Sequence, residues 1–171
     1  IKGDGHDISA GPRGGVWLVG GGKEPGGYGI YYRWKQAWHK VPGSALRIAA
    51  DPHSQAWVVN DAGAIFRFDG NGLKRMPGAA RDIGIGAKGH VWVIGTNKVP
   101  GGYGIYRWTG KTWKNIKGGG VRIAVTPQGN AWVVNNANDI FFHDGKIWHH
   151  IAGKAKDVGV GANDTTWIVG E

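Results

Sequence analysis

Short apolar runs alternate with polar turns along the whole chain. The turns are rich in Gly, Asn and Asp, and no segment combines a helical period with a capping signal. Such runs are typical of short β-strands. Over the best-defined stretch the predicted strands are 83–86, 91–95, 104–108, 112–116, 122–125, 131–135, 140–143 and 147–151. The pattern therefore predicts an all-β chain made of four-stranded groups.

These groups recur with a period of 75 residues. The sequence PGGYGIY occupies residues 25–31 and again 100–106, and AWVVN occupies 56–60 and 131–135. A repeat of this length is too small to bury its own apolar face, so neighbouring copies must stack in an array or a ring. Four strands in 35 to 40 residues form the blade of a β-propeller.

Tryptophan recurs in the apolar second strand of each group. The positions are Trp17, Trp57, Trp92, Trp132 and Trp167. Runs that are apolar on both faces are typical of strands buried on both sides, so we expect these rings to pack between blades rather than to bind a ligand. Asp7, Asp82 and Asp157 begin the three copies, and we expect each carboxylate to accept hydrogen bonds from local backbone N–H groups.

The pattern DIGIGA, VWVIG, GIYRW and a further Trp, which starts at Asp82, closely resembles the tectonin β-propeller repeat. The resemblance extends from Asp7 to Gly170. It implies a propeller of four-stranded antiparallel blades that closes with six blades. It also implies a tectonin-type lectin that binds lipopolysaccharide sugars or O-methylated saccharides, although repeats of this family occur in intracellular, membrane-linked proteins as well.

The chain holds fewer blades than the resemblance implies. We expect a single propeller over residues 1–171, with blades at about 7–46, 47–80, 81–120 and 121–155 and part of a fifth at 156–171. A five-bladed ring that shares its last blade between the termini needs two strands that residues 1–6 are too short to supply. The remaining expectations are a fragment of a longer propeller, an incompletely determined sequence, or blades completed by another copy.

Composition narrows the function classes. The net charge of +9 favours anionic partners such as lipopolysaccharide, phospholipid headgroups, sulfated glycans or nucleic acid, although lysine also protects outer strand edges from pairing. Cysteine is absent, which excludes disulfides, and no run of 18 apolar residues predicts a transmembrane segment. Asn163 begins a glycosylation acceptor triplet. A secreted or cell-surface location is favoured over the cytoplasm.

Catalytic motifs are missing. The sequence has no Gly-x-Ser-x-Gly, phosphate loop, dinucleotide fingerprint or His-Glu-x-x-His, and no recurring carboxylate pair. Its seven histidines do not follow the repeat. We therefore predict a non-enzymatic protein without a cofactor or metal.

The candidate binding site is the segment between the second and third strands of each odd blade, residues 21–28 and 96–103. It combines a cation, a Gly-Gly pair that we expect to be flexible, and a tyrosine, which suit the hydroxyls and C–H faces of sugars. Connections of one type lie on one propeller face, so the even blades add asparagines to the same rim. The predicted ligand-binding residues are Lys23, Tyr28, Asn60, Asn97, Lys98, Tyr103, Asn135 and Asn136. The alternative is structural: a wide Pro-Gly-Gly turn over a packed tyrosine, with asparagines that cap turns.

The sequence thus predicts a lectin with repeated, individually weak sites that gain strength through multivalency, suited to a role in defence. The alternative is a propeller scaffold that binds protein or an anionic membrane. Nucleic acid is disfavoured, since basic and aromatic residues interleave in any alternating strand.

Overall fold

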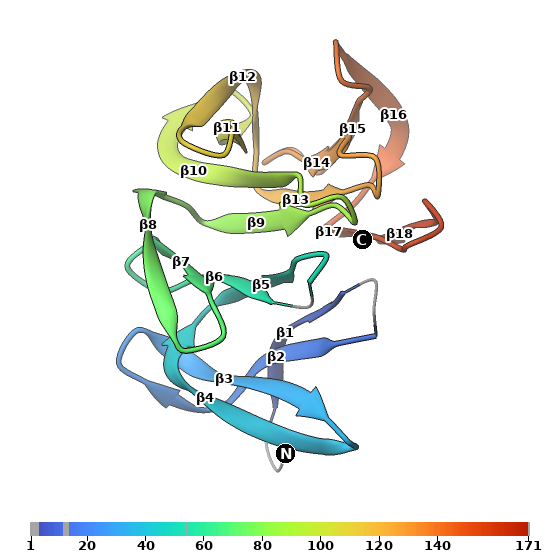
Figure 1. Ribbon diagram of the computed structural model, residues 1–171. Coiled ribbons are helices and arrows are strands. Elements are labelled where there is room, and N and C mark those ends of the chain that lie inside the picture. The colour runs from blue at the N-terminus through green and yellow to red at the C-terminus, as the bar shows by residue number, and fades with distance from the viewer. Residues whose placement is uncertain (1–3, 12–13, 54, 171) are drawn as a thin grey trace. The chain divides into compact units, whose positions relative to one another are not determined.

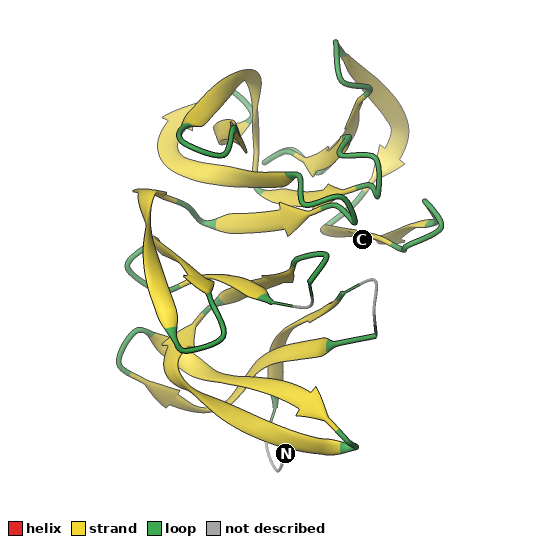
Figure 2. Ribbon diagram, viewed as in Figure 1, coloured by secondary structure: helices red, strands yellow, loops and turns green. Residues whose placement is uncertain are grey.

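The computed structural model describes residues 4–11, 14–53 and 55–170, and these residues form strands and turns without any helix (Figure 2). None of them therefore belongs to a helix that could cross a membrane. The strands are β1 Gly5–Ala10, β2 Val16–Glu24, β3 Gly27–Trp34, β4 Ala37–Ala45, β5 Arg47–Ala50, β6 Ala56–Val59, β7 Ala64–Phe68, β8 Leu73–Ala79, β9 Asp82–Ile85, β10 Val91–Val99, β11 Gly102–Trp108, β12 Trp113–Gly120, β13 Arg122–Val125, β14 Ala131–Val134, β15 Asp139–His143, β16 Trp148–Lys154, β17 Asp157–Val160 and β18 Thr166–Val169 (Figure 1).

The strands pair in chain order into antiparallel sheets. β1–β4, β5–β8, β9–β12 and β13–β16 each form a four-stranded sheet, and β17–β18 form a two-stranded sheet. The predicted fold class is confirmed: the chain is all-β and consists of four complete propeller blades followed by two strands of a fifth.

The chain divides into two compact units. The first, Ile1–Ala79, contains the first two blades, and the second, Ala80–Glu171, contains the next two blades and the β17–β18 pair. Within each unit the first strands of successive blades lie side by side, β1 beside β5 in the first unit and β9, β13 and β17 in the second.

Apolar second strands supply the core of each unit. All four residues of β6 are buried, and so are the first five of β10, as expected for strands covered on both faces. Trp17, Trp57 and Trp92 are buried, and Trp132 packs against the core of the second unit. Four of the five predicted core tryptophans are therefore confirmed.

Trp167 is the exception, because 71% of its surface is exposed. It lies in β18, which pairs with β17 on one edge and with no described strand on the other. The ring therefore lacks the third-strand side chain that covers its counterparts. That cover comes from Tyr32 on Trp17, Arg67 on Trp57, Arg107 on Trp92 and Phe142 on Trp132.

Two of the three recurring aspartates, Asp7 and Asp82, accept a hydrogen bond from the following blade. Asp7 accepts a hydrogen bond from Ile8 N (3.0 Å) and a second from Ile48 N of the next blade (2.8 Å). Asp82 accepts from Ile123 N at 2.9 Å in the same way. The expectation of purely local bonding was incomplete, since one carboxylate oxygen reaches the first strand of the following blade.

Candidate functional site

The two candidate segments are hairpin arms, one in each unit. We call residues 21–28 the first arm and residues 96–103 the second arm. The first arm joins the end of β2 to the start of β3, and the second joins β10 to β11. A shift in strand register precedes each arm, between Gly20 and Lys23 and between Ile94 and Lys98. The segment that was expected to connect the second and third strands is therefore mostly strand, because β2, β3, β10 and β11 continue almost to the tip.

Only two residues form each tip. Glu24 pairs with Gly27, which leaves Pro25 and Gly26 between the strands, and Gly26 has a φ of 94°. Proline followed by glycine at positive φ is the arrangement of a type II turn. Pro100 and Gly101 repeat it, with a φ of 86° at Gly101.

The second glycine of each tip is fixed by close packing. At Gly27, where φ is 136°, a Cβ would lie 2.4 Å from the carbonyl oxygen of Ala45. At Gly102, where φ is 133°, it would lie 2.6 Å from that of Gly120. The Gly-Gly pair therefore holds the arm against the fourth strand of its blade, and the expected flexibility is not what these residues provide.

A lysine and a tyrosine face each other across each arm. Lys23 is the cross-strand partner of Tyr28, and Lys98 is the partner of Tyr103. Directly opposed residues project from the same face of a sheet, about 5 Å apart at Cβ. Both lysines are exposed, whereas both tyrosines are half-buried against the core of their unit.

A further side chain covers the ring of each tyrosine. His6 stacks on Tyr28 with ring centroids 4.3 Å apart, and the Arg81 guanidinium carbon lies 4.3 Å from the centroid of Tyr103. One face of each tyrosine ring is therefore occupied, as in the structural alternative of a packed tyrosine. Sequence reasoning missed His6 and Arg81, although their spacing of one full period and their position directly before the recurring aspartate were visible.

A turn of the next blade binds the tip of each arm. Asp61 N donates a hydrogen bond of 3.0 Å to the carbonyl oxygen of Gly26, and Asn136 N donates one of 3.0 Å to that of Gly101. We call residues 60–63 and 135–138 the companion turns. Within each unit, the arm and its companion turn therefore lie on the same rim.

Three of the predicted asparagines have partners within the protein. Asn60 Oδ1 accepts from Ala64 N at 2.7 Å, and Asn135 Oδ1 accepts from Asp139 N at 2.8 Å, so both cap companion turns. Asn97 accepts from the Tyr106 hydroxyl at 2.8 Å. Contact between these residues and a ligand stays a prediction, as it does for Asn136, whose side chain is exposed.

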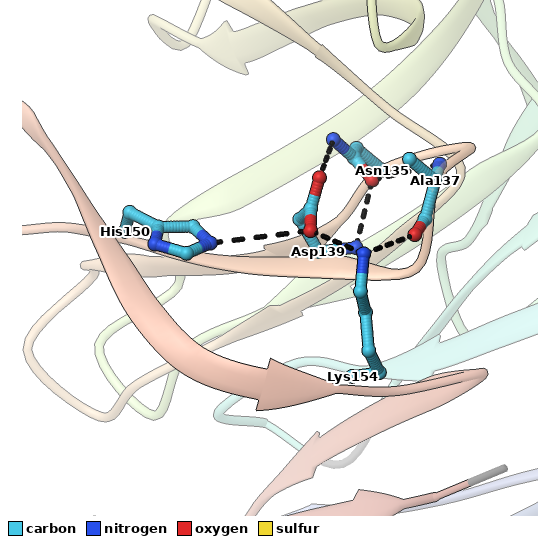
Figure 3. A network of polar contacts seen from close by, with 5 residues as sticks. All are labelled: Asn135, Ala137, Asp139, His150 and Lys154. Atoms are coloured by element: carbon cyan, nitrogen blue, oxygen red, sulfur yellow. Dashed lines mark hydrogen bonds and ion pairs between the residues drawn. The ribbon is translucent and has the colours of Figure 1, made fainter.

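A polar network holds the companion turn of the second unit (Figure 3). Lys154 Nζ donates to Ala137 O at 2.9 Å and to Asp139 Oδ1 at 2.6 Å, while Asn135 Nδ2 donates to Asp139 Oδ2 at 3.1 Å. His150 Nε2 lies 4.0 Å from Asp139 Oδ1. The hydrogen bond from Lys154 is the main cause that lowers the pKa of Asp139, and the bond from Asn135 adds to it.

In each unit the rim therefore presents a lysine ammonium group, a tyrosine supported by a stacked side chain, and a turn fixed by hydrogen bonds. Such groups bind ligands by donating hydrogen bonds and by positive charge.

Comparison with known proteins places this geometry in a family. The model of the Tectonin domain matches residues 44–129, half of the chain. No curated protein sequence matches. The solved structure of YCF48 bound to D1 peptide is similar with a TM-score of 0.60 and 18% identity over 97% of this chain and 60% of that one. The structure of YCF48 from Cyanidioschyzon merolae has a TM-score of 0.60 and 14% identity, over 98% of this chain and 65% of that one.

A variant of the Aleuria aurantia lectin, in complex with Fucα1-6GlcNAc, is also similar. Its TM-score is 0.56, with 15% identity over 90% of this chain and 65% of the lectin. The chain thus spans 60–65% of the length of these three solved proteins. At these identities the structures show the shared fold alone, whereas the family match covers the repeat itself. The chain belongs to the Tectonin domain family.

Proposed function

We propose that the protein is a lectin, a non-enzymatic module that binds surface glycans through its two hairpin arms. The observation that carries the proposal is the repetition, on two arms, of an exposed lysine opposite a half-buried tyrosine, with each arm hydrogen-bonded to a companion turn. Preformed polar groups on a rigid scaffold bind at low entropic cost. Two such sites in one chain provide multivalent attachment.

Two further observations support a glycan as the ligand. The family resemblance extends to lectins for lipopolysaccharide sugars and O-methylated saccharides, and the structurally similar Aleuria aurantia lectin holds a fucosylated sugar. A secreted or cell-surface location accords with such ligands and belongs to the proposal.

A glycan array with bacterial lipopolysaccharide cores and O-methylated saccharides tests the proposal. We expect binding to a related set of glycans, competed by the free sugar. The Lys23→Ala/Lys98→Ala variant should lose most of this binding. The matched control is Lys74→Ala/Lys111→Ala, which removes two exposed lysines at the opposite end of their blades.

A blank array from folded protein would overturn the lectin proposal. It would favour a second candidate, a propeller that binds a peptide, because the structurally similar YCF48 holds the D1 peptide. Retention of glycan binding by the Lys23→Ala/Lys98→Ala variant would instead contradict the assignment of the arms.

A further inference from the structure

We infer that the second arm carries an anion-binding site in which Arg81 and Lys98 flank Tyr103 and hold a phosphate or sulfate ester of a charged glycan. The inference deepens the proposed function and, as far as the glycan is concerned, rests on it. The first arm has the same backbone and lacks this site.

The ring of Tyr103 orients the guanidinium group of Arg81. The Arg81 guanidinium lies over the ring, 4.3 Å from its centroid, and the Arg81 side chain is exposed. Stacking restrains a planar guanidinium by its face and leaves its N–H edge directed outward. A fork of N–H donors held in this way matches the oxygens of phosphate or sulfate and binds two of them at once.

Lys98 supplies a second positive charge. It is the cross-strand partner of Tyr103, so its side chain leaves the same face of the arm on which Arg81 stacks. Within the described residues, neither Arg81 nor Lys98 forms an ion pair. Both charges therefore remain available to an external anion.

Nearby carboxylates are already engaged. Asp82, the neighbour of Arg81 in the chain, is buried and accepts from Ile123 N. Asp139, at the base of the companion turn, is held by Lys154 and Asn135 (Figure 3). The Lys154 ammonium offsets the negative charge of Asp139, and the buried Asp82 carboxylate accepts from the Ile123 N–H of the next blade.

The first arm is an internal comparison that carries less positive charge. At the positions of Arg81 and Asn136 it has His6 and Asp61, and at the position of Val99 it has Glu24. Glu24 pairs with Lys40. Every one of these differences makes the second arm more positive, while the lysine, the tyrosine and the turn are retained. The two arms thus share a scaffold and differ in the charge of the ligand that they accept.

The test is an NMR titration of the whole chain with sodium phosphate at pH 7.5, with sodium chloride at matched ionic strength as the reference. We expect saturable shifts of the Arg81 Nε–H and the Lys98 backbone N–H signals with phosphate alone. Arg81→His copies the first arm, and a histidine with an ordinary pKa of about 6.5 is mostly neutral at this pH, so phosphate affinity should fall about tenfold. Lys111→Ala, which removes an exposed lysine at the other end of the blade, should leave affinity unchanged.

The reverse substitution keeps the test independent of any loss of folding. His6→Arg combined with Glu24→Val and Asp61→Asn should give the first arm a saturable phosphate response. Glucose 6-phosphate and glucose 6-sulfate then show which ester is preferred, with glucose as the uncharged reference. Equal responses to phosphate and chloride, an unchanged response in Arg81→His, or equal affinity for glucose would each overturn the inference.

Failure of this inference and failure of the lectin proposal are separable. Phosphate binding with a blank glycan array would leave the anion site standing without a lectin. An array confined to neutral glycans, with no phosphate response, would leave the lectin standing without the anion site.

Discussion

Asp82 Oδ2 accepts a hydrogen bond of 2.9 Å from the backbone N–H of Ile123, which joins the first strands of two successive blades. Asp82 is 7% exposed, so the bond is formed away from water. The same contact links Asp7 to Ile48 in the other unit. One side chain thus satisfies a backbone donor where two sheets meet edge to edge without a shared ladder.

Asp82→Ala should lower the free energy of unfolding of the second unit by about 1–3 kcal/mol, because it leaves the Ile123 N–H buried and unpaired. Urea denaturation followed by tryptophan fluorescence measures the change. Asp157→Ala is the control, since Asp157 is exposed, accepts from the N–H of its own neighbour Val158, and reaches the preceding blade only through a 3.9 Å ion pair with Arg122. If both variants lost the same free energy of unfolding, the hydrogen bond between the blades would not be the cause of the loss in Asp82→Ala.

Trp92 and Trp167 occupy equivalent positions and should differ sharply in importance. Trp92 is 1% exposed, and its Nε1 donates to Gly129 O at 3.1 Å, so Trp92→Ala should cost about 3–5 kcal/mol. Trp167 is mostly exposed, and Trp167→Ala should change stability by less than about 0.5 kcal/mol. Thermal unfolding of both variants checks the contrast, and a large loss in Trp167→Ala would contradict the exposed position of β18.

His143 should make the second unit sensitive to acid. It packs against Trp92 and Trp148, and burial lowers its pKa below the ordinary 6.5. Below pH 6.5 the unfolded chain therefore binds the proton more readily than the folded one. Stability is full above this value and falls as the pH drops towards the folded pKa. Urea unfolding at pH 7.5 and pH 5.0 should show the loss.

His143→Phe provides the matched variant, because Phe68 holds the equivalent position in the first unit and packs on Trp17. The substitution forfeits the hydrogen bond from Gly145 N, at about 1 kcal/mol, but should reduce the dependence on pH. Some pH dependence of stability should remain in this variant because of His90, whose pKa is also lowered, first by burial and then by the charge of Arg107. An unchanged pH profile in His143→Phe would assign the acid sensitivity to other groups.

Lys154→Ala should raise the pKa of Asp139 towards its ordinary 3.8, because the hydrogen bond from Lys154 is the main cause of its depression. In the native chain the lowered pKa contributes stability that is present above pH 3.8 and is lost as the pH falls through the folded value. Carboxyl ¹³C NMR titration measures the shift. Lys156→Ala, at a nearby exposed lysine outside the network, should leave the Asp139 pKa where it is.

The fold could be predicted in detail because the 75-residue period, the turn residues and the apolar runs all indicate the same strand positions. β13 was predicted at its full length, and β10 was predicted from its correct first residue. The extension of β10 to Val99 was missed, because Thr96, Asn97 and Lys98 are polar and resemble a loop. What holds them in a strand is pairing with β11, which depends on partners outside the local sequence.

The candidate site was predictable in position and less so in chemistry. The placement of each arm beside its companion turn follows from the period, but the sequence left open whether the ring of Tyr103 faces a ligand or is packed. Its cover comes from Arg81, which is 22 residues away in the chain and reaches the ring only through the fold. Periodicity locates equivalent positions, whereas the contacts between them depend on which strands become neighbours.

The hydrogen bond from an aspartate to the next blade is present in alternate blades only. Asp82 pairs with Ile94 in β9–β10, and the corresponding position of β13, opposite Val134, holds Arg122. Arg122 reaches the following blade only as an ion pair at 3.9 Å from Asp157. A pair of blades is therefore the smallest unit that contains a complete hydrogen bond from an aspartate to the next blade. A change of length in steps of 75 residues would preserve this alternation, whereas a step of one blade would place an arginine at a position that holds an aspartate here.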